Sequence, residues 1–342
     1  MKSSFWLGVG IISLSGIFNG TFAVPMKYIR DWRWENMWLM FSVFSLLVFP
    51  AWLAIQFVPH LWQTYTDTPL TSLAVPFGLG ILLGIAQVTY GLGLASVGIA
   101  VCIAVVSGVS CVAGAIVPLL LLSPGDLLQP QSILLLVSIP ILICGLAFFG
   151  VAGHRREREQ RDAAAAPEIV PWGFGAGLAL CTLTGILGSS NNLGFVFGDA
   201  VMRSSVALGG TAVTSTYALW ALLFVASFIP NLVYCGILLS RNDSWTLFLQ
   251  KSWRKELTLT AAMGLLSFAA IIGYGIGATA LGKYGTSLGW AVFVATTIIA
   301  STLSGVLMDE WRGTSQLTKR LLVIAVAVIL ASVLTLDFGG VA

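Results

Sequence analysis

Long apolar stretches, separated by short polar segments, recur along the whole sequence. Ten such stretches lie at roughly 5–25, 38–58, 71–94, 98–122, 132–152, 172–197, 206–239, 257–280, 285–307 and 320–338. A helix needs about 20 apolar residues to cross the hydrocarbon core of a bilayer. The pattern therefore predicts an all-α polytopic membrane protein with ten transmembrane helices.

Two places in this pattern are irregular. The seventh stretch is longer than one crossing needs, and we expect its first part, up to about Thr214, to be a loop or an irregular entry. Between the third and fourth stretches, residues 94–98 (LASVG) leave room only for a tight turn.

Composition narrows the protein class. Hydrophobic residues make up 57% of the 342 residues and charged residues only 9%, against about 25% charged residues in soluble domains. So few charges would not cover the surface of a soluble protein. The five cysteines lie inside apolar stretches without a CxxC pair, so we expect core residues, and no cofactor or metal is predicted. Residues 5–25 are too long for a signal peptide's apolar region and are interpreted as the first span.

Lysine and arginine are distributed unevenly between the two sides. With ten spans, fourteen of the 17 Lys and Arg fall in odd-numbered connections, and Lys2, Arg203 and Lys283 fall on the other side. Because cytoplasmic loops are rich in Lys and Arg, we expect both termini in the periplasm. The basic residues lie in short loops, so the net charge of +3 does not indicate a nucleic-acid partner. The lipid bilayer is the expected environment.

Charge and span number together predict an internal repeat. The charged segment HRREREQRDAAAAPE (154–168) divides the spans five and five, with a first repeat at 1–153, a cytoplasmic linker at 154–170 and a second repeat at 171–342. Five is an odd number, so the two halves would have opposite orientations. The first connection of the first half carries three cations and its counterpart only Arg203, whereas the second connections carry none and four. This alternation predicts an inverted five-plus-five repeat, which is common among secondary transporters.

Enzyme motifs are missing from the sequence. There is no HExxH, no GxSxG with partner residues and no P-loop, and the two histidines, His60 and His154, fall in loops. We therefore expect a transporter rather than an enzyme. A sensory or structural membrane protein is the alternative.

The acidic residues bear on the substrate and on ion coupling. Every Asp and Glu maps to a loop or to a span end, so no buried anion is expected that would neutralise an organic cation. This favours a neutral polar substrate. Asp199, at the end of the sixth span, is expected nearest to burial, and Glu35 lies at the expected inner mouth. These two are the candidate proton-coupling residues; sodium coupling or facilitated diffusion would need neither.

Neutral polar and aromatic residues within the spans are the candidate substrate-binding groups. Amide side chains both donate and accept hydrogen bonds, which suits vicinal hydroxyls, and aromatic rings suit the apolar face of a sugar. Hydrogen bonding between helices is the alternative use of the same residues. The candidates are Asn19, Gln87, Tyr90, Asn191, Asn192, Asn231, Tyr274 and Trp290.

Three stretches of the sequence are distinctive: PMKYIRDWRWENMW (25–38), GIAQVTYGLGLASVGIA (84–100) and GVLMDEWRG (305–313). They resemble the bacterial L-rhamnose–proton symporter family, which is part of the drug/metabolite transporter superfamily. The resemblance runs along nearly the whole chain. It implies an inner-membrane carrier with an inverted five-plus-five repeat, which imports L-rhamnose or a related deoxyhexose in symport with protons by alternating access.

Single positions both follow and depart from that family. Its third-span amide falls on Gln87, where Asn is expected, its aromatic residue on Tyr90, and its polar seventh-span position on Asn231. The run YGIGATALGKYGTSLGW (274–290) has small residues where polar ones are expected. The alternative function is therefore a carrier of the same type for another small polar metabolite, acting as a uniporter or an exporter.

The first connection combines tryptophans with charges. We expect Trp32, Trp34 and Trp38 at the level of the lipid headgroups as interfacial anchors. Glu35 is expected to pair with Arg30 or a lipid-facing cation, or to exchange a proton. The order of residues also suggests a role in closing the cytoplasmic side.

Overall fold

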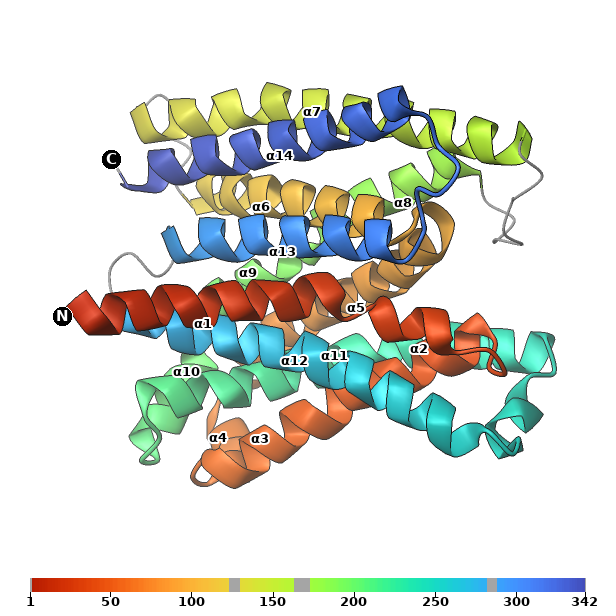
Figure 1. Cartoon of the computed structure of the whole chain (residues 1–342). Helices are drawn as coiled ribbons and strands as arrows, with labels where there is room; N and C mark the ends of the chain where they lie inside the picture. The colour runs from red at the N-terminus through yellow and green to blue at the C-terminus, as the bar shows by residue number, and fades with distance from the viewer. Residues whose placement is uncertain (1, 123–129, 163–172, 282–287, 342) are drawn as a thin grey trace. The chain divides into compact units, whose positions relative to one another are not determined.

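The computed structural model describes residues 2–122, 130–162, 173–281 and 288–341, apart from some side chains within the helices. All regular secondary structure in this part of the chain is helical (Figure 1). The short helices η1 and η4 are 3-10 helices, and η2 is a π-helix. The elements are α1 (Lys2–Thr21), η1 (Val24–Tyr28), α2 (Trp34–Ser42), η2 (Val43–Val48), α3 (Phe49–Phe57), α4 (Leu61–Asp67), α5 (Leu70–Val97), α6 (Ile99–Leu122), α7 (Pro130–Asp162), α8 (Phe174–Gly188), α9 (Ser190–Phe197), α10 (Asp199–Ala207), α11 (Ala212–Arg241), η4 (Trp245–Leu249), α12 (Trp253–Leu281), α13 (Leu288–Leu307) and α14 (Gln316–Val341).

The predicted class of a polytopic helical membrane protein is confirmed. Among the described residues, seven helical segments are long and apolar enough to cross a membrane. Three shorter apolar helices, Ile99–Ala113, Phe174–Gly188 and Val292–Leu307, coincide with predicted spans four, six and nine. Ten crossings in an inverted repeat stay a prediction.

Both irregular places have the expected local structure. Gly98 has a φ of +86° and separates α5 from α6, which is the predicted tight turn. The seventh span begins only at Ala212, after the separate helix α10. Thr211 and Thr214 form a capping box there: the Thr214 N–H donates to Thr211 Oγ1 at 3.1 Å and the Thr211 N–H to Thr214 Oγ1 at 2.8 Å.

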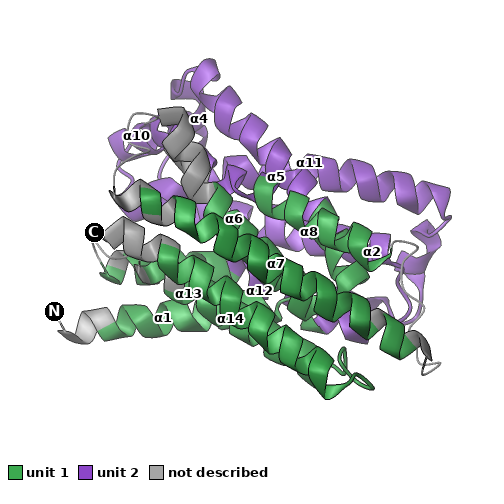
Figure 2. Cartoon of the chain, turned by 90° about the horizontal axis from the view of Figure 1, so that it is seen from above, with its two compact units in different colours: residues 1–24, 89–186, 269–342 green, residues 25–88, 187–268 purple. Residues whose placement is uncertain are grey.

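The chain forms two compact units, coloured separately in Figure 2. Unit 1 contains residues 1–24, 89–186 and 269–342, and unit 2 contains residues 25–88 and 187–268. Each unit takes segments from both halves of the sequence. The predicted repeats, 1–153 and 171–342, are continuous stretches of the sequence, whereas each compact unit is made of separate segments. The repeats stay a prediction. Of the predicted linker, residues 154–162 continue α7 and residues 163–170 lie outside the described residues.

Unit 1 is a bundle of long helices. Helices α7 and α14 lie side by side, and α6 contacts both of them (Figure 1). The buried Ser332 hydroxyl on α14 donates to the Ser138 carbonyl on α7 at 2.7 Å. Helix α13 contacts α1, α6 and α14.

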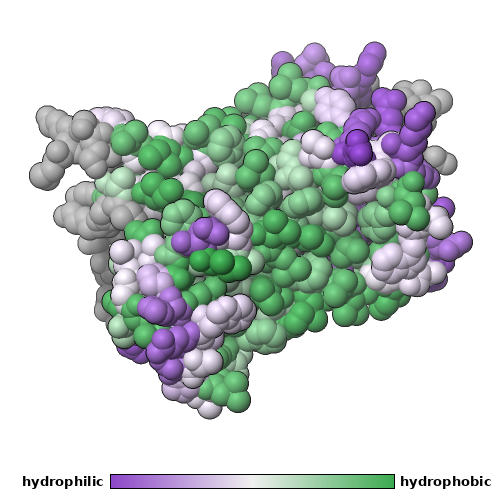
Figure 3. Space-filling view, turned by 90° about the horizontal axis from the view of Figure 1, so that it is seen from below, coloured by the Kyte–Doolittle hydropathy of each residue, from purple (hydrophilic) through white to green (hydrophobic). Residues whose placement is uncertain are grey.

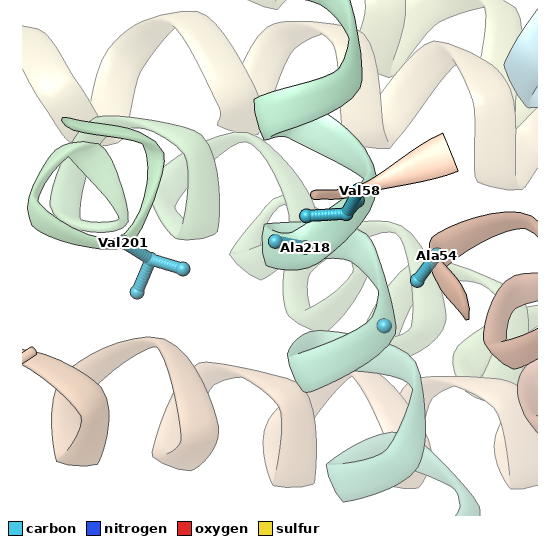
Figure 4. Packing of buried hydrophobic residues seen from close by; sticks show 5 residues of the cluster. Ala54, Val58, Val201 and Ala218 are labelled. Carbon is cyan, nitrogen blue, oxygen red and sulfur yellow. The ribbon is translucent and has the colours of Figure 1, made fainter. Parts of the chain in front are cut away.

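Unit 2 is organised around α11. This helix contacts α2, η2, α3, α9 and α10. Near its start, Ala218 and Ala221 pack with Ala54 and Val58 from the end of α3 and with Val201 from α10 (Figure 4). Small side chains at this position let the three helices approach closely.

The exposed side chains fit a bilayer environment. Trp6, Ile143 and Val323, on α1, α7 and α14, are 69%, 60% and 65% exposed. On the face drawn in Figure 3, most surface residues are hydrophobic and hydrophilic ones gather toward the margins. Extensive exposed apolar surface is unusual for a soluble monomer and marks contact with lipid or another partner.

Candidate functional site

Asn231, at the centre of α11, is a structural amide. It is completely buried. Its Nδ2 donates to the carbonyls of Gly84 on α5, at 3.2 Å, and Ser227, at 2.9 Å. Its Oδ1 accepts from Trp38 Nε1 at 3.1 Å and Ser42 Oγ at 3.3 Å, both on α2. An amide offers two donors and two acceptor positions, so the capacity of Asn231 is fully used in joining α2, α5 and α11.

Glycines let α5 approach α11 closely. A Cβ on Gly84 would meet the Ser227 carbonyl and the Pro230 ring, and one on Gly80 would lie 2.5 Å from the Leu223 carbonyl oxygen. Ser227 Oγ lies 2.8 Å from the Gly80 carbonyl and 2.7 Å from that of Leu223. Since residue numbers rise together along both helices, α5 and α11 are parallel here.

Helix α9 packs on the same stretch of α11 in the opposite direction. A Cβ on Gly194 would lie 2.9 Å from the Leu223 side chain, and one on Gly198 would meet Leu219. Helix α9 begins at Ser190, directly after a break at Ser189 that separates it from α8. The predicted sixth span therefore contains two helices, α8 and α9, which meet at Ser189, and the backbone of Ser189 stays in the right-handed helical region.

Three buried polar atoms on α5 and α9 have no hydrogen-bond partner within the described part of the chain. They are Oε1 of Gln87 on α5, and Oγ of Ser190 and Oδ1 of Asn191 on α9. The glycine contacts show which residues of α5 and α9 lie at the same height along α11. Counting a rise of about 1.5 Å per residue from these contacts, Ser190 lies roughly level with Ser227. Gln87 lies about one helical turn beyond Ser227. Buried polar groups are normally hydrogen-bonded, and an exception calls for an explanation.

The other predicted binding residues lie mostly in unit 1. Asn19 Nδ2 donates to Thr297 Oγ1 on α13 at 3.4 Å. The rings of Tyr90 and Phe22 are 5.7 Å apart, and those of Tyr274 and Phe293 are 5.2 Å apart. The side chains of Asn192 and Trp290 lie outside the described residues. The structure thus brings Gln87 and Asn191 to one region of unit 2, and gives Asn231 the helix-to-helix role.

Glu35 lies where the first connection between predicted spans contacts the seventh one. It is 4% exposed, and its Oε1 accepts from Asn242 Nδ2 at 3.0 Å and Ser244 Oγ at 2.7 Å. Arg33 and Asn36 donate to the carbonyls of Asn242 and Ser244. The expected pairing of Glu35 with Arg30 is wrong, because its partners come from residues more than 200 positions away.

The expected role of the tryptophans as headgroup anchors is wrong for two of the three. Trp32 and Trp38 are only 7% and 0% exposed. Trp32 Nε1 donates to the Leu247 carbonyl at 3.0 Å, and Trp38 bonds to Asn231. Their indole N–H groups are used inside the protein, which a buried tryptophan normally requires.

Asp199 is not the acidic residue nearest to burial, contrary to expectation. It forms an exposed ion pair at 2.7 Å with Arg203, one turn later on α10. Among the acidic residues whose side chains the structure describes, Glu35 and Glu256 are the buried ones, and Glu256 has no exposed surface. The sequence did not indicate this burial, because Glu256 stands beside Lys255 at the start of a helix.

Two motifs singled out in the sequence meet in unit 1. The Glu310 carboxylate accepts from the N–H groups of Ile99, at 2.9 Å, and Ala100, at 3.4 Å, at the start of α6. A carboxylate is favoured there by the helix dipole and the free N–H groups. A Cβ on Gly98 would lie 2.8 Å from Glu310, so both the turn and this contact require glycine.

No group of three or more His, Cys, Asp or Glu among the described residues is arranged to hold a metal ion. The site in unit 2 offers neutral hydrogen-bonding groups. Such groups are suited to a hydroxylated, uncharged ligand.

Comparison with known proteins finds relatives over the full length. Residues 1–341 match the protein family described as L-rhamnose-proton symport protein (RhaT). The L-rhamnose-proton symporter of Pectobacterium atrosepticum is 22% identical over 342 residues, covering 98% of this chain and 96% of that protein. Those of Yersinia pestis and Yersinia pseudotuberculosis are 23% identical over 346 residues, covering 99% of this chain and 99% of each relative.

Proposed function

Since the chain belongs to the L-rhamnose-proton symport protein family, we propose that it imports L-rhamnose, or a closely related deoxyhexose, together with protons. This family consists of transporters and not of enzymes. The chain is a multi-pass membrane protein with at least seven apolar helices that are long enough to span. The three shorter apolar helices support ten spans in an inverted repeat.

The observation that carries this proposal is the set of unpartnered polar atoms on Gln87, Ser190 and Asn191. Hydroxyl groups of a neutral sugar would donate to the two amide oxygens and exchange a hydrogen bond with the serine. Ser190 and Asn191 begin α9 at the point where it meets α8 within the predicted sixth span, and irregular points in helices commonly contribute to transporter sites. We propose that these three residues of unit 2 bind the substrate.

The remaining candidates keep their proposed roles. Asn19, Tyr90, Asn192, Tyr274 and Trp290 are proposed substrate-binding residues. Of the two candidate proton-coupling residues, we propose the buried Glu35 before Asp199, because Asp199 is held in an exposed ion pair with Arg203. The Lys and Arg distribution supports an inner-membrane orientation with both termini in the periplasm. Alternating access of the substrate site to the two sides is the proposed transport mechanism.

Uptake of radiolabelled L-rhamnose into proteoliposomes tests the proposal. We expect accumulation above the external concentration only when an inward proton gradient is imposed, with protein-free liposomes as the control. Uptake that only equilibrates would retain the sugar and remove proton coupling. If correctly folded protein takes up no L-rhamnose under any condition, the alternative of another small polar metabolite replaces this proposal.

A further inference from the structure

The charged ends of α7 and α14 lie side by side in unit 1 (Figure 1). Toward one end of this helix pair, the Ser332 hydroxyl on α14 donates to the Ser138 carbonyl on α7. Toward the other end, the Glu159 carboxylate on α7 accepts from the Ser315 N–H and the Thr318 hydroxyl at the start of α14. The two helices are therefore antiparallel, and these contacts fix which of their residues lie at the same height.

Exposed cations gather at the Glu159 end of the helix pair. Counting a rise of about 1.5 Å per residue from the contacts above, Arg155 on α7 lies roughly level with Lys319 and Arg320 on α14. The Arg155 Nε is 3.9 Å from Glu159 Oε1, which accepts from Thr318 Oγ1 at 2.8 Å, so the guanidinium group lies near the first turn of α14. We use the name basic patch for four exposed side chains at this end: Arg155, Arg158, Lys319 and Arg320.

The basic patch has almost no anionic partner within the described residues. Three of its members form no ion pair there, and the fourth, Arg155, has only the 3.9 Å contact with Glu159. The Glu159 carboxylate already accepts hydrogen bonds from Ser315 and Thr318. Like charges held close together attract an anion from the surroundings. The basic patch therefore offers positive charge to a negatively charged partner.

The neighbouring Arg156 is used inside the protein instead. Its guanidinium group lies over the rings of Phe174 and Trp311, at 5.9 and 5.0 Å from their centroids. It also donates to the Val97 carbonyl at 3.2 Å. The members of the basic patch make no such contact within the described residues and are exposed. The cations of the basic patch are therefore not required to hold these helix ends together.

Exposed apolar side chains continue from the basic patch along both helices. Val151 lies one turn before Arg155 on α7, and Val323 lies one turn after Lys319 on α14; both valines are exposed and roughly level with each other. One turn corresponds to about 5–6 Å along the helix axis. In a phospholipid the phosphate likewise lies directly beside the start of the acyl chains. An acidic soluble partner would need the cations but not the apolar side chains next to them.

We propose that the basic patch binds the headgroup of an anionic phospholipid, with its phosphate near Arg155, Lys319 and Arg320 and its acyl chains along Val151 and Val323. Arginine suits this role because its guanidinium group can donate two parallel hydrogen bonds to a phosphate. Clusters of Lys and Arg next to a membrane-spanning helix attract anionic lipids. This inference concerns one end of unit 1 and does not depend on which substrate the chain transports.

Native mass spectrometry of the full chain in detergent tests the proposal. Phosphatidylglycerol and phosphatidylcholine with identical acyl chains are added in turn, and the dissociation constant of the first bound lipid is measured. We expect the wild type to prefer phosphatidylglycerol by at least about tenfold. The combined change Lys319→Gln and Arg320→Gln should weaken phosphatidylglycerol binding about fivefold for each cation removed and leave phosphatidylcholine binding unchanged. The matched control, Lys251→Gln with Lys255→Gln, removes two exposed cations of unit 2 and should leave both affinities unchanged.

Several results would overturn this assignment. Equal affinity of the wild type for the two lipids would exclude selection of the anionic headgroup. An equal loss in the control variant would show an effect of net charge rather than of this patch. Glycerol 3-phosphate carries the phosphate without acyl chains, and its competition at the same concentration as the lipid would assign the patch to a soluble phosphate compound. If the double variant does not fold, Lys319→Gln alone is measured, and unchanged phosphatidylglycerol binding would exclude the proposal. Arg320→Lys retains the charge and should retain the affinity.

Discussion

Asn231 on α11 and Asn191 on α9 both have a buried side-chain oxygen, yet the surroundings of the two oxygens differ. Asn231 makes four hydrogen bonds that join three helices. The Asn191 side-chain oxygen makes none within the described residues. An isolated buried acceptor costs about 1–3 kcal/mol, so its presence needs a compensating purpose. The comparison teaches that a polar residue within a span serves the fold when it is satisfied and is available for a ligand when it is not.

The largest effect is expected for Asn231→Leu. The change removes all four bonds and leaves the Trp38 N–H and the Ser42 hydroxyl without this acceptor, so the free energy of unfolding should fall by about 2–4 kcal/mol. Denaturant unfolding followed by tryptophan fluorescence in detergent measures it. The same substitution at position 191 is the matched comparison. A loss below about 0.5 kcal/mol would mean that Asn231 does not hold the helices together.

A somewhat smaller loss of stability is expected for Gly84→Ala. The added Cβ would meet the Ser227 carbonyl and the Pro230 ring, and such overpacking costs about 1–3 kcal/mol. It should also lengthen the Asn231 contact with α5. Thermal unfolding of the purified protein measures the change. Gly78→Ala, on the same helix but with open space around the added Cβ, is the control; equal effects at both positions would contradict the close approach of α5 and α11.

Asn191→Leu is expected to change affinity and leave stability intact. The side-chain oxygen of Asn191 has no hydrogen bond to lose within the described residues, so an apolar group of similar shape at this position should be nearly neutral for stability. Loss of one hydrogen bond to the substrate, about 1.4 kcal/mol, corresponds to about tenfold weaker binding. The concentration dependence of L-rhamnose counterflow, in which internal unlabelled sugar exchanges for external labelled sugar, and the unfolding temperature together check this. If the affinity is unchanged and the stability falls, Asn191 has a structural role like that of Asn231 and does not bind the substrate.

The smallest effect is expected for Asp199→Asn. This carboxylate forms an exposed pair with Arg203, and such pairs contribute at most about 0.5 kcal/mol. We expect unchanged unfolding and accumulation within about twofold of the wild type. Proton-driven uptake by Asp199→Asn and by Glu35→Gln compares the two candidate carboxylates directly. Loss of accumulation in Asp199→Asn would instead show that proton coupling requires this carboxylate.

Much of the fold was predictable because it depends on local chemistry. Apolar stretches of spanning length located the long helices, and LASVG located the turn at Gly98. The late start of α11 followed from a stretch that was too long for one crossing. The division into two compact units was not predictable, since it depends on contacts between segments far apart in the chain.

For the candidate site, the sequence predicted which residues to consider but not how they are arranged. Gln87, Asn191 and Asn231 were selected together because an amide within a span is unusual wherever it occurs. Sequence does not show whether each one meets a partner on another helix. Trp38 and Glu35 illustrate the same point, because position in a charged connection indicated the surface while their partners lie about 190 to 210 residues away.

The sequence by itself determined the helical membrane class, most helix boundaries and the family, because hydropathy, turn chemistry and a full-length match are properties of the chain alone. The tertiary structure decided which buried polar groups are satisfied. Hydrogen bonding is short-ranged and directional, so Asn231 and Asn191 differ only through the neighbours that folding brings to them.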